Sequence, residues 1–167
     1  SDRALRQHFE NVVGSLQHPL VMGRLCGLQM LQQLLLVLPT EVIDVYALVM
    51  FMAMMQLMAN ERDRRMKRSI QYTLRKYLLP RIENDQFWEF WTVNEEWVKS
   101  TKCNLRTAAL QSVRSFVTQQ THSVTKQNLL AMAKLMVEVG IQPAVSLHCS
   151  SVRTVDYGQN HAVWKPA

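Results

Sequence analysis

Glycine, proline and cysteine are all scarce in this chain of 167 residues, which holds five glycines, five prolines and three cysteines. So few turn-forming residues disfavour β-sandwiches and barrels, whose short strands need frequent turns. Cys26, Cys103 and Cys149 are far apart and odd in number, so they indicate neither a disulfide framework nor a CxxC metal motif. We therefore expect reduced thiols in an intracellular protein.

Motifs that carry known chemistry are also missing. The sequence contains no GxxxxGK[ST], GxGxxG or HExxH motif and no EF-hand loop. His122, His148, Cys149 and His161 match no zinc-finger spacing, and we interpret them as ordinary side chains. Cys103 falls on an expected helix that supplies no obvious oxyanion hole. The sequence therefore predicts a protein that is not an enzyme and binds no metal or cofactor.

Residues that propagate helices are abundant, with Leu, Met, Gln, Arg and Ala all frequent. Apolar side chains recur at helical spacing, and Pro39, Pro80 and Gly140 mark breaks. The pattern predicts an all-α domain over residues 1–140, with six to seven antiparallel helices paired as HEAT- or armadillo-like hairpins. Residues 141–167 lack helical periodicity and are predicted to form an extended tail.

Boundaries between the expected helices follow from these breaks and from capping residues. The expected helices span about residues 3–13, 20–38, 41–59, 62–79, 85–91, 95–120 and 124–139. Thr40 is the expected cap of the third helix, and Asn94 is the expected cap of the long sixth one. Glu95 and Glu96 would then lie in its first turn, where acidic side chains complement the helix dipole.

The most apolar stretch, residues 46–58, contains Gln56 as its one polar side chain. It spans about a dozen residues, whereas a transmembrane helix needs roughly 20. We interpret it as a buried core helix with no membrane contact. Its methionines suit either a core or an adaptable groove for a partner helix. We favour the core, with one edge open to a partner at Met54 and Met58.

A strongly basic segment follows directly. The net charge of the chain is +6, and residues 62–81 hold eight of its nineteen Lys and Arg side chains. A solvated helix face would explain some of them, but this local excess favours a surface that binds a polyanion. The candidate residues are Arg62, Arg64, Arg65, Lys67, Arg68, Arg75, Lys76 and Arg81.

Aromatic residues cluster in the segment after Pro80. Tryptophans anchor protein interfaces, but they also fill gaps between packed helices, and both interpretations stay open here. The candidate interface residues in this segment are Phe87, Trp88, Trp91 and Trp97.

The order of these features resembles a known family. A helix ends in Arg-Lys-Tyr-Leu-Leu-Pro-Arg-Ile at residues 75–82, and Glu-Glu-Trp-Val-Lys-Ser-Thr-Lys-Cys follows at residues 95–103. Leu-Gln-Ser-Val at 110–113 and Leu-Leu-Ala-Met-Ala-Lys-Leu-Met at 129–136 complete the succession. Over residues 28–137 it resembles the conserved C-terminal helical domain of the regulatory, non-ATPase subunit of katanin.

This resemblance implies a regulatory and targeting subunit that forms a heterodimer with the N-terminal helical domain of katanin's AAA ATPase. It implies microtubules, through their acidic tubulin tails, and spindle-pole proteins as partners. The implied location is the cytoplasmic cytoskeleton, at the spindle and centrosome. The alternative is a HEAT-like scaffold that binds nucleic acid or another polyanion through residues 62–81.

Overall fold

The computed structural model describes residues 2–118, 127, 130–131, 133–135 and 137. It confirms the all-α prediction, since helices dominate the described residues and no strand occurs among them. The α-helices are α1 (Asp2–Ser15), α2 (Val21–Val37), α3 (Thr40–Asn60), α4 (Arg64–Thr73), α5 (Asn84–Val98) and α6 (Cys103–Thr118). Between α4 and α5 the chain forms a π-helical turn, η1 (Leu74–Leu78), and a 3-10 turn, η2 (Leu79–Arg81).

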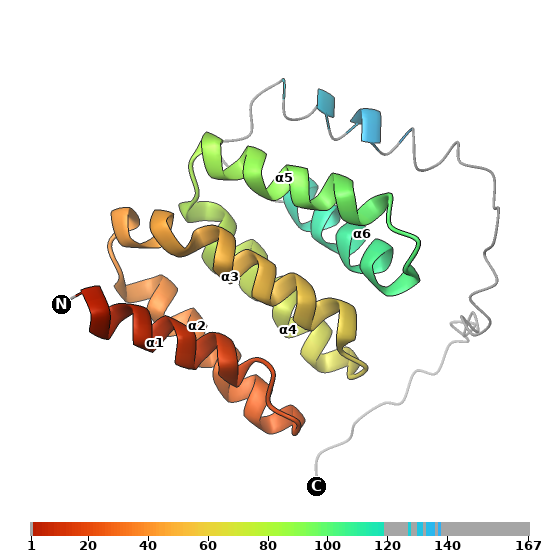
Figure 1. Cartoon of the computed structure of the whole chain (residues 1–167). Coiled ribbons are helices and arrows are strands. Elements are labelled where there is room, and N and C mark those ends of the chain that lie inside the picture. The colour runs from red at the N-terminus through yellow and green to blue at the C-terminus, as the bar shows by residue number, and fades with distance from the viewer. Residues whose placement is uncertain (1, 119–126, 128–129, 132, 136, 138–167) are drawn as a thin grey trace, which may run out of the picture.

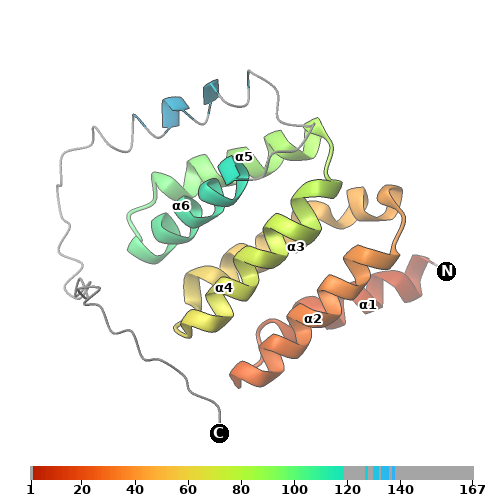
Figure 2. The ribbon, with the colours of Figure 1, turned by 180° about the vertical axis from the view of Figure 1, so that it is seen from behind.

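The helices stack as three successive antiparallel hairpins. Figure 1 shows α1 with α2, α3 with α4, and α5 with α6, one pair above another. One layer contains α1, α3 and α5, and the other contains α2, α4 and α6, which lie nearest the viewer in Figure 2. Residues from α2, α4 and α6 can therefore share one surface although they are distant in the sequence.

The central helix α3 forms most of the core. Met50, Met54, Met55 and Met58 are buried, which confirms the core interpretation of these methionines. Phe51 stacks on Phe90 of α5 with ring centroids 4.3 Å apart, and Phe116 of α6 meets Phe51 edge-on. The helix is long and apolar enough to cross a membrane, but 56% of its most apolar window is buried against the other helices.

The boundary predicted near Asn94 is wrong. One continuous helix, α5, runs from Asn84 to Val98, and the break comes at residues 99–102. A capping box between Glu83 and Gln86 starts this helix. Asn94 is fully buried within it and donates a hydrogen bond of 3.0 Å to the Phe90 carbonyl. It acts as a polar core residue, because an Asn side chain can bond to the preceding helical turn as well as cap a helix.

Two further expectations change with the observed helix ends. Glu95 and Glu96 lie in the last turns of α5, where acidic side chains oppose the helix dipole. Helix α3 starts at Thr40 itself, with Pro39 in the cap position and no side-chain cap. The break at Pro39 is confirmed, but the predicted Thr40 cap is not.

The last predicted helix is described only in part. Residues 127, 130–131, 133–135 and 137 are helical, and Leu135 is buried against the core. The predicted tail at 141–167 lies outside the described residues. His122, His148, Cys149 and His161 also lie outside them.

Candidate functional site

The predicted basic segment divides into three structural parts. The turn at residues 61–63 carries Arg62, helix α4 carries the next four cations, and η1 and η2 carry the last three. Met66, Ile70 and Leu74 form the buried side of this segment. The exposed cations are Arg62, Arg64, Arg65, Arg68 and Lys76, while Lys67, Arg75 and Arg81 are half-buried. Five of the eight cations are therefore exposed to solvent, whereas Arg81 contacts the protein itself.

Arg81 is committed to the fold rather than to an external anion. Its guanidinium donates hydrogen bonds to the carbonyl oxygens of Leu35 and Leu38, the latter at 2.7 Å. It also reaches Thr40 Oγ1 at 3.3 Å. These contacts satisfy carbonyls that the end of α2 leaves without helical partners. These three hydrogen bonds argue against Arg81 as part of a polyanion-binding surface, because they hold its guanidinium against the end of α2.

The two acidic residues beside the basic segment do not neutralise it. Asp63 is the N-cap of α4, and its side chain accepts a hydrogen bond of 2.8 Å from the Met66 backbone. Glu61 is buried and is paired with Arg24 of α2. Glu61 is neutralised by Arg24, and the single remaining charge of Asp63 is outnumbered by the seven cations of residues 62–76, so this segment keeps a net positive potential.

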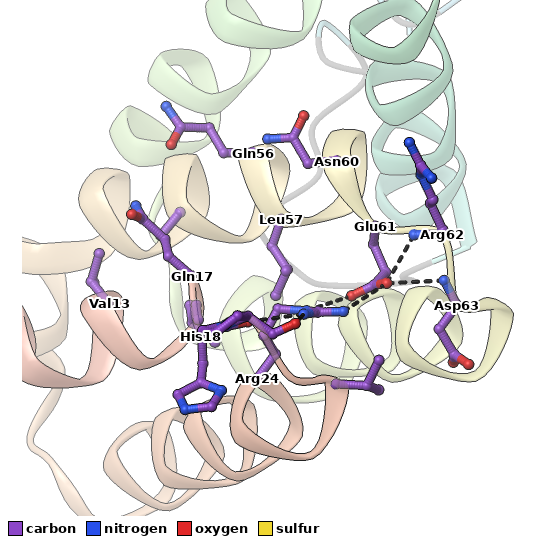
Figure 3. A pocket seen from close by; sticks show the side chains of 14 residues that line it. Val13, Gln17, His18, Arg24, Gln56, Leu57, Asn60, Glu61, Arg62 and Asp63 are labelled. Carbon is purple, nitrogen blue, oxygen red and sulfur yellow. Dashed lines mark hydrogen bonds and ion pairs between the residues drawn. The ribbon is translucent and has the colours of Figure 1, made fainter.

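The Arg24–Glu61 pair lies in a hollow of about 860 Å³ between the α1–α2 turn and the end of α3 (Figure 3). Arg24 Nε and Nη2 donate to the Glu61 carboxylate at 2.8 and 3.1 Å. Arg24 Nη1 donates to the carbonyls of His18 and Pro19. Figure 3 shows the guanidinium pointing at the carboxylate, so the buried charges here satisfy each other. We call this the ion-paired hollow.

The pKa of Glu61 reflects these contacts. Burial works to raise the pKa of this carboxyl, since it disfavours the charged form. Hydrogen bonds from Arg24 and from the backbone N–H groups of Asp63 and Arg62, together with the charge of Arg24, outweigh burial and lower the pKa. Glu61 is therefore an ionised structural group at neutral pH, not a poised acid.

The second hollow, of about 500 Å³, opens on the layer formed by α2, α4 and α6. Arg68 of α4, Arg75 of η1 and Arg114 of α6 line it, together with polar side chains only. Those are Gln32, Ser69, Gln71, Tyr72, Gln111, Ser115 and Thr118. Among the residues that the structure describes, no acidic side chain contributes to its lining and none forms an ion pair with its three arginines. We call this the cationic hollow.

Hydrogen bonds fix the floor of the cationic hollow. Gln32 Nε2 donates to Thr73 Oγ1 at 2.8 Å, and Thr73 Oγ1 in turn donates to the Ser69 carbonyl. Thr73 is fully buried, so this chain of bonds ties α2 to α4 beneath the arginines. The site is therefore built on packed helices rather than on a loop.

Sequence reasoning found Arg68 and Arg75 but missed Arg114, because α6 lies far from the basic segment in the chain. A usable signal was present. Gln111, Arg114, Ser115 and Thr118 recur at i, i+3, i+4 and i+7, which predicts a polar stripe along one side of a helix. That stripe faces the hollow from α6.

The predicted partner interface is largely internal. Met54, Met58, Phe87 and Trp91 are each no more than 2% exposed, so they hold the core together and offer no surface in this structure. They are buried because α3 packs against both α5 and α6. Trp88 and Trp97 are half-buried against the same core. Exposed apolar side chains occur instead on α3 at Val45, Leu48 and Val49.

Metal-binding groups do not come together in the described part of the chain, where no cluster of three or more His, Cys, Asp or Glu occurs. Cys26 is exposed and Cys103 is half-buried at the start of α6. The cationic hollow is thus the strongest candidate for a functional site. No family model, curated protein or solved structure matches this chain, so its function has to be argued from its own residues.

Proposed function

We propose that this chain is a non-catalytic helical adaptor whose cationic surface contacts an acidic macromolecule. Helix α4 exposes Arg64, Arg65 and Arg68, and the adjacent acids Glu61 and Asp63 are occupied elsewhere. The observation that carries the proposal is this set of arginines without acidic partners among the described residues. Uncompensated charge on one helix face favours the approach of a polyanion.

We propose microtubules as the acidic partner and the N-terminal helical domain of katanin's AAA ATPase as the second partner. The support for both is the resemblance in the order of motifs described above. Tubulin tails are acidic and extended, so a row of arginines on a rigid helix suits them. In this proposal the ATPase supplies the catalysis and the present chain supplies position.

The exposed apolar residues of α3 give the ATPase partner a plausible surface in place of the buried methionines. Val45, Leu48 and Val49 follow i, i+3, i+4 spacing, and Val45 is 73% exposed. Helix α3 belongs to the layer opposite α4 (Figure 2). An adaptor built this way contacts one partner through each layer, since a helix can dock on an apolar stripe while the arginines stay in water.

Microtubule pelleting tests the cationic surface. We expect the wild-type chain to pellet with microtubules at low salt and to do so less after the tubulin tails are removed. Replacing Arg64 and Arg65 with Glu should abolish pelleting. The matched control replaces Arg3 and Arg6, which are exposed on α1, with Glu, so that the net charge changes equally. Equal loss in both variants, or none in either, would contradict a role for α4.

The alternative partner, nucleic acid, is tested with the same two variants. Binding of a labelled RNA or DNA that depends on Arg64 and Arg65, without microtubule pelleting, would replace microtubules with nucleic acid as the partner. Co-elution with the ATPase helical domain on size exclusion tests the second interface. We expect a one-to-one complex that is lost when Val45 and Val49 are both changed to Asp.

A further inference from the structure

We propose that the cationic hollow is a site for a small phosphorylated polyol, a molecule that carries at least two phosphoryl groups and a free hydroxyl. This proposal does not rest on the identity of the macromolecular partner. It concerns a concave site that Arg114 completes, whereas the adaptor surface concerns the exposed side of α4.

The charge of the hollow sets the charge of its ligand. Arg68, Arg75 and Arg114 supply three guanidinium groups, and no acidic side chain from the described part of the chain lines the hollow. A phosphoryl group carries about −1.5 to −2 at neutral pH, so two of them balance three arginines. Guanidinium groups also bind phosphate oxygens in a bidentate manner, which favours phosphoryl groups over an arbitrary anion.

The volume of the hollow sets the size of the ligand. About 500 Å³ lies within the range of roughly 300–1,000 Å³ that is typical of small-molecule sites. Inorganic phosphate would leave most of this space to water. A small ring or chain that bears separate phosphoryl groups fills more of it and offers one group to Arg68 and Arg75 and another to Arg114.

Gln111 indicates that the ligand also donates a hydrogen bond. Its Oε1 atom is buried and accepts no hydrogen bond from any described residue. A buried acceptor without a donor costs free energy, and a fully ionised phosphate offers it none. The half-buried Gln111 side chain lines the hollow, so a turn of its amide group would bring Oε1 to a ligand hydroxyl that satisfies it, which is why we infer a polyol rather than pyrophosphate.

The backbone beneath Arg75 is a second and independent feature of the site. Arg75 lies in the π-helical turn η1, and the Leu79 N–H bonds to the Leu74 carbonyl five residues earlier. Such wide turns within helices are rare and occur often at functional sites. Here the wide turn begins directly after Thr73, which anchors the floor of the hollow.

Calorimetric titration of the full chain with inositol trisphosphate tests the proposal. We expect binding by the wild type, weaker binding of pyrophosphate, and none of unphosphorylated inositol. Arg114→Gln and Arg75→Gln should each weaken binding by about tenfold or more. Arg6→Gln removes one positive charge from the exposed side of α1, outside the hollow, and should leave the affinity within about twofold.

A fourth variant, Gln111→Leu, tests the hydroxyl contact. It should weaken inositol trisphosphate binding while leaving pyrophosphate binding unchanged, and melting curves show whether each variant is folded. Absence of trisphosphate binding to the folded wild type would overturn the proposal. Equal affinities of the wild type and folded Arg114→Gln would also overturn it.

Vesicles separate the two sources of such a ligand. Flotation with phosphatidylcholine vesicles that contain phosphatidylinositol bisphosphate, competed by soluble inositol trisphosphate, would identify a lipid headgroup. Trisphosphate binding without flotation would identify a free phosphorylated polyol. The adaptor and the polyol site fail separately, because the Arg64 and Arg65 double variant reports on the first and Arg114→Gln on the second.

Discussion

The ion-paired hollow and the cationic hollow contain arginines in opposite circumstances. In the ion-paired hollow, every nitrogen of the Arg24 guanidinium has an acceptor, either on Glu61 or on a backbone carbonyl. In the cationic hollow, no described carboxylate approaches Arg68, Arg75 or Arg114. The ion-paired arginine stabilises the fold, whereas the three arginines of the cationic hollow are positioned to bind an anionic ligand. An arginine whose donors already have acceptors within the protein is structural, and one without such acceptors is a candidate for ligand binding.

Breaking the ion pair should produce the largest loss of stability. Arg24→Met leaves Glu61 buried with its two backbone donors but without its counter-charge. We expect the free energy of unfolding to fall by about 2–3 kcal/mol, measured by urea denaturation. Arg68→Met, made for comparison in the other hollow, should change it far less. Similar losses in both variants would mean that the two hollows do not differ in this way.

Helices α1 and α2, which meet at the ion-paired hollow, approach each other closely at Gly27. A Cβ at Gly27 would lie 2.8 Å from Ser15 Cβ and 3.0 Å from the Ser15 carbonyl carbon. Backbone cannot move away cheaply, so Gly27→Ala should lower the free energy of unfolding by about 1–2 kcal/mol. Gly14→Ala serves as the control, because a Cβ there meets nothing within 4 Å. That variant should match or exceed wild-type stability, since alanine favours helix.

Arg81 tests whether an arginine within the basic segment follows the structural pattern. Arg81→Met removes the donors to the Leu35 and Leu38 carbonyls. We expect a loss of roughly 1 kcal/mol in thermal or urea unfolding. Inositol trisphosphate affinity should be unchanged in the same variant. A stable Arg81→Met protein with weakened ligand binding would return Arg81 to the binding surface.

Acid should affect the two hollows differently, with the smallest effect in this series. The pKa of Glu61 is lower in the folded chain than in the unfolded chain, so folding favours its ionised form. Its stabilising contribution is present above the ordinary carboxyl pKa, about 4.3, and is lost as the pH falls through the lowered folded pKa. Glu61→Gln should therefore show a shallower loss of stability below about pH 4.3 than the wild type. Parallel pH profiles for the two proteins would argue against this contribution.

Helix type and core were predictable from the sequence because both depend on local periodicity. Met66, Ile70 and Leu74 recur at i, i+4 and i+8 and are buried, and most of the methionines of α3 are buried as predicted. The boundary near Asn94 failed because an Asn is read equally well as a cap or as a buried polar residue. Only the packing of α5 against α3 and α6 decides between the two.

The candidate site was half predictable for a related reason. Charge density along the chain located Arg68 and Arg75, but a concave site needs residues that the fold brings together from separate helices. Arg114 stands 39 positions after Arg75 in the sequence, and nothing local connects them. The contacts of Arg81 and Glu61 could not be predicted for the same reason, since their partners lie on α2 or directly after its end.

The π-helical turn at Leu74–Leu78 also has a consequence for how this segment tolerates changes in length. A π turn accommodates one residue more than the α-helix around it. Deleting one residue there would therefore convert the turn into regular α-helix. Deletion of Leu74, the one residue of this turn that precedes Arg75, would rotate Arg75 relative to Arg68 by about 100° around the helix axis. The position of Arg75 in the cationic hollow therefore depends on a single extra residue in the backbone. A chain without Leu74 would keep its helices and its net charge but would lose the geometry that brings the three arginines together.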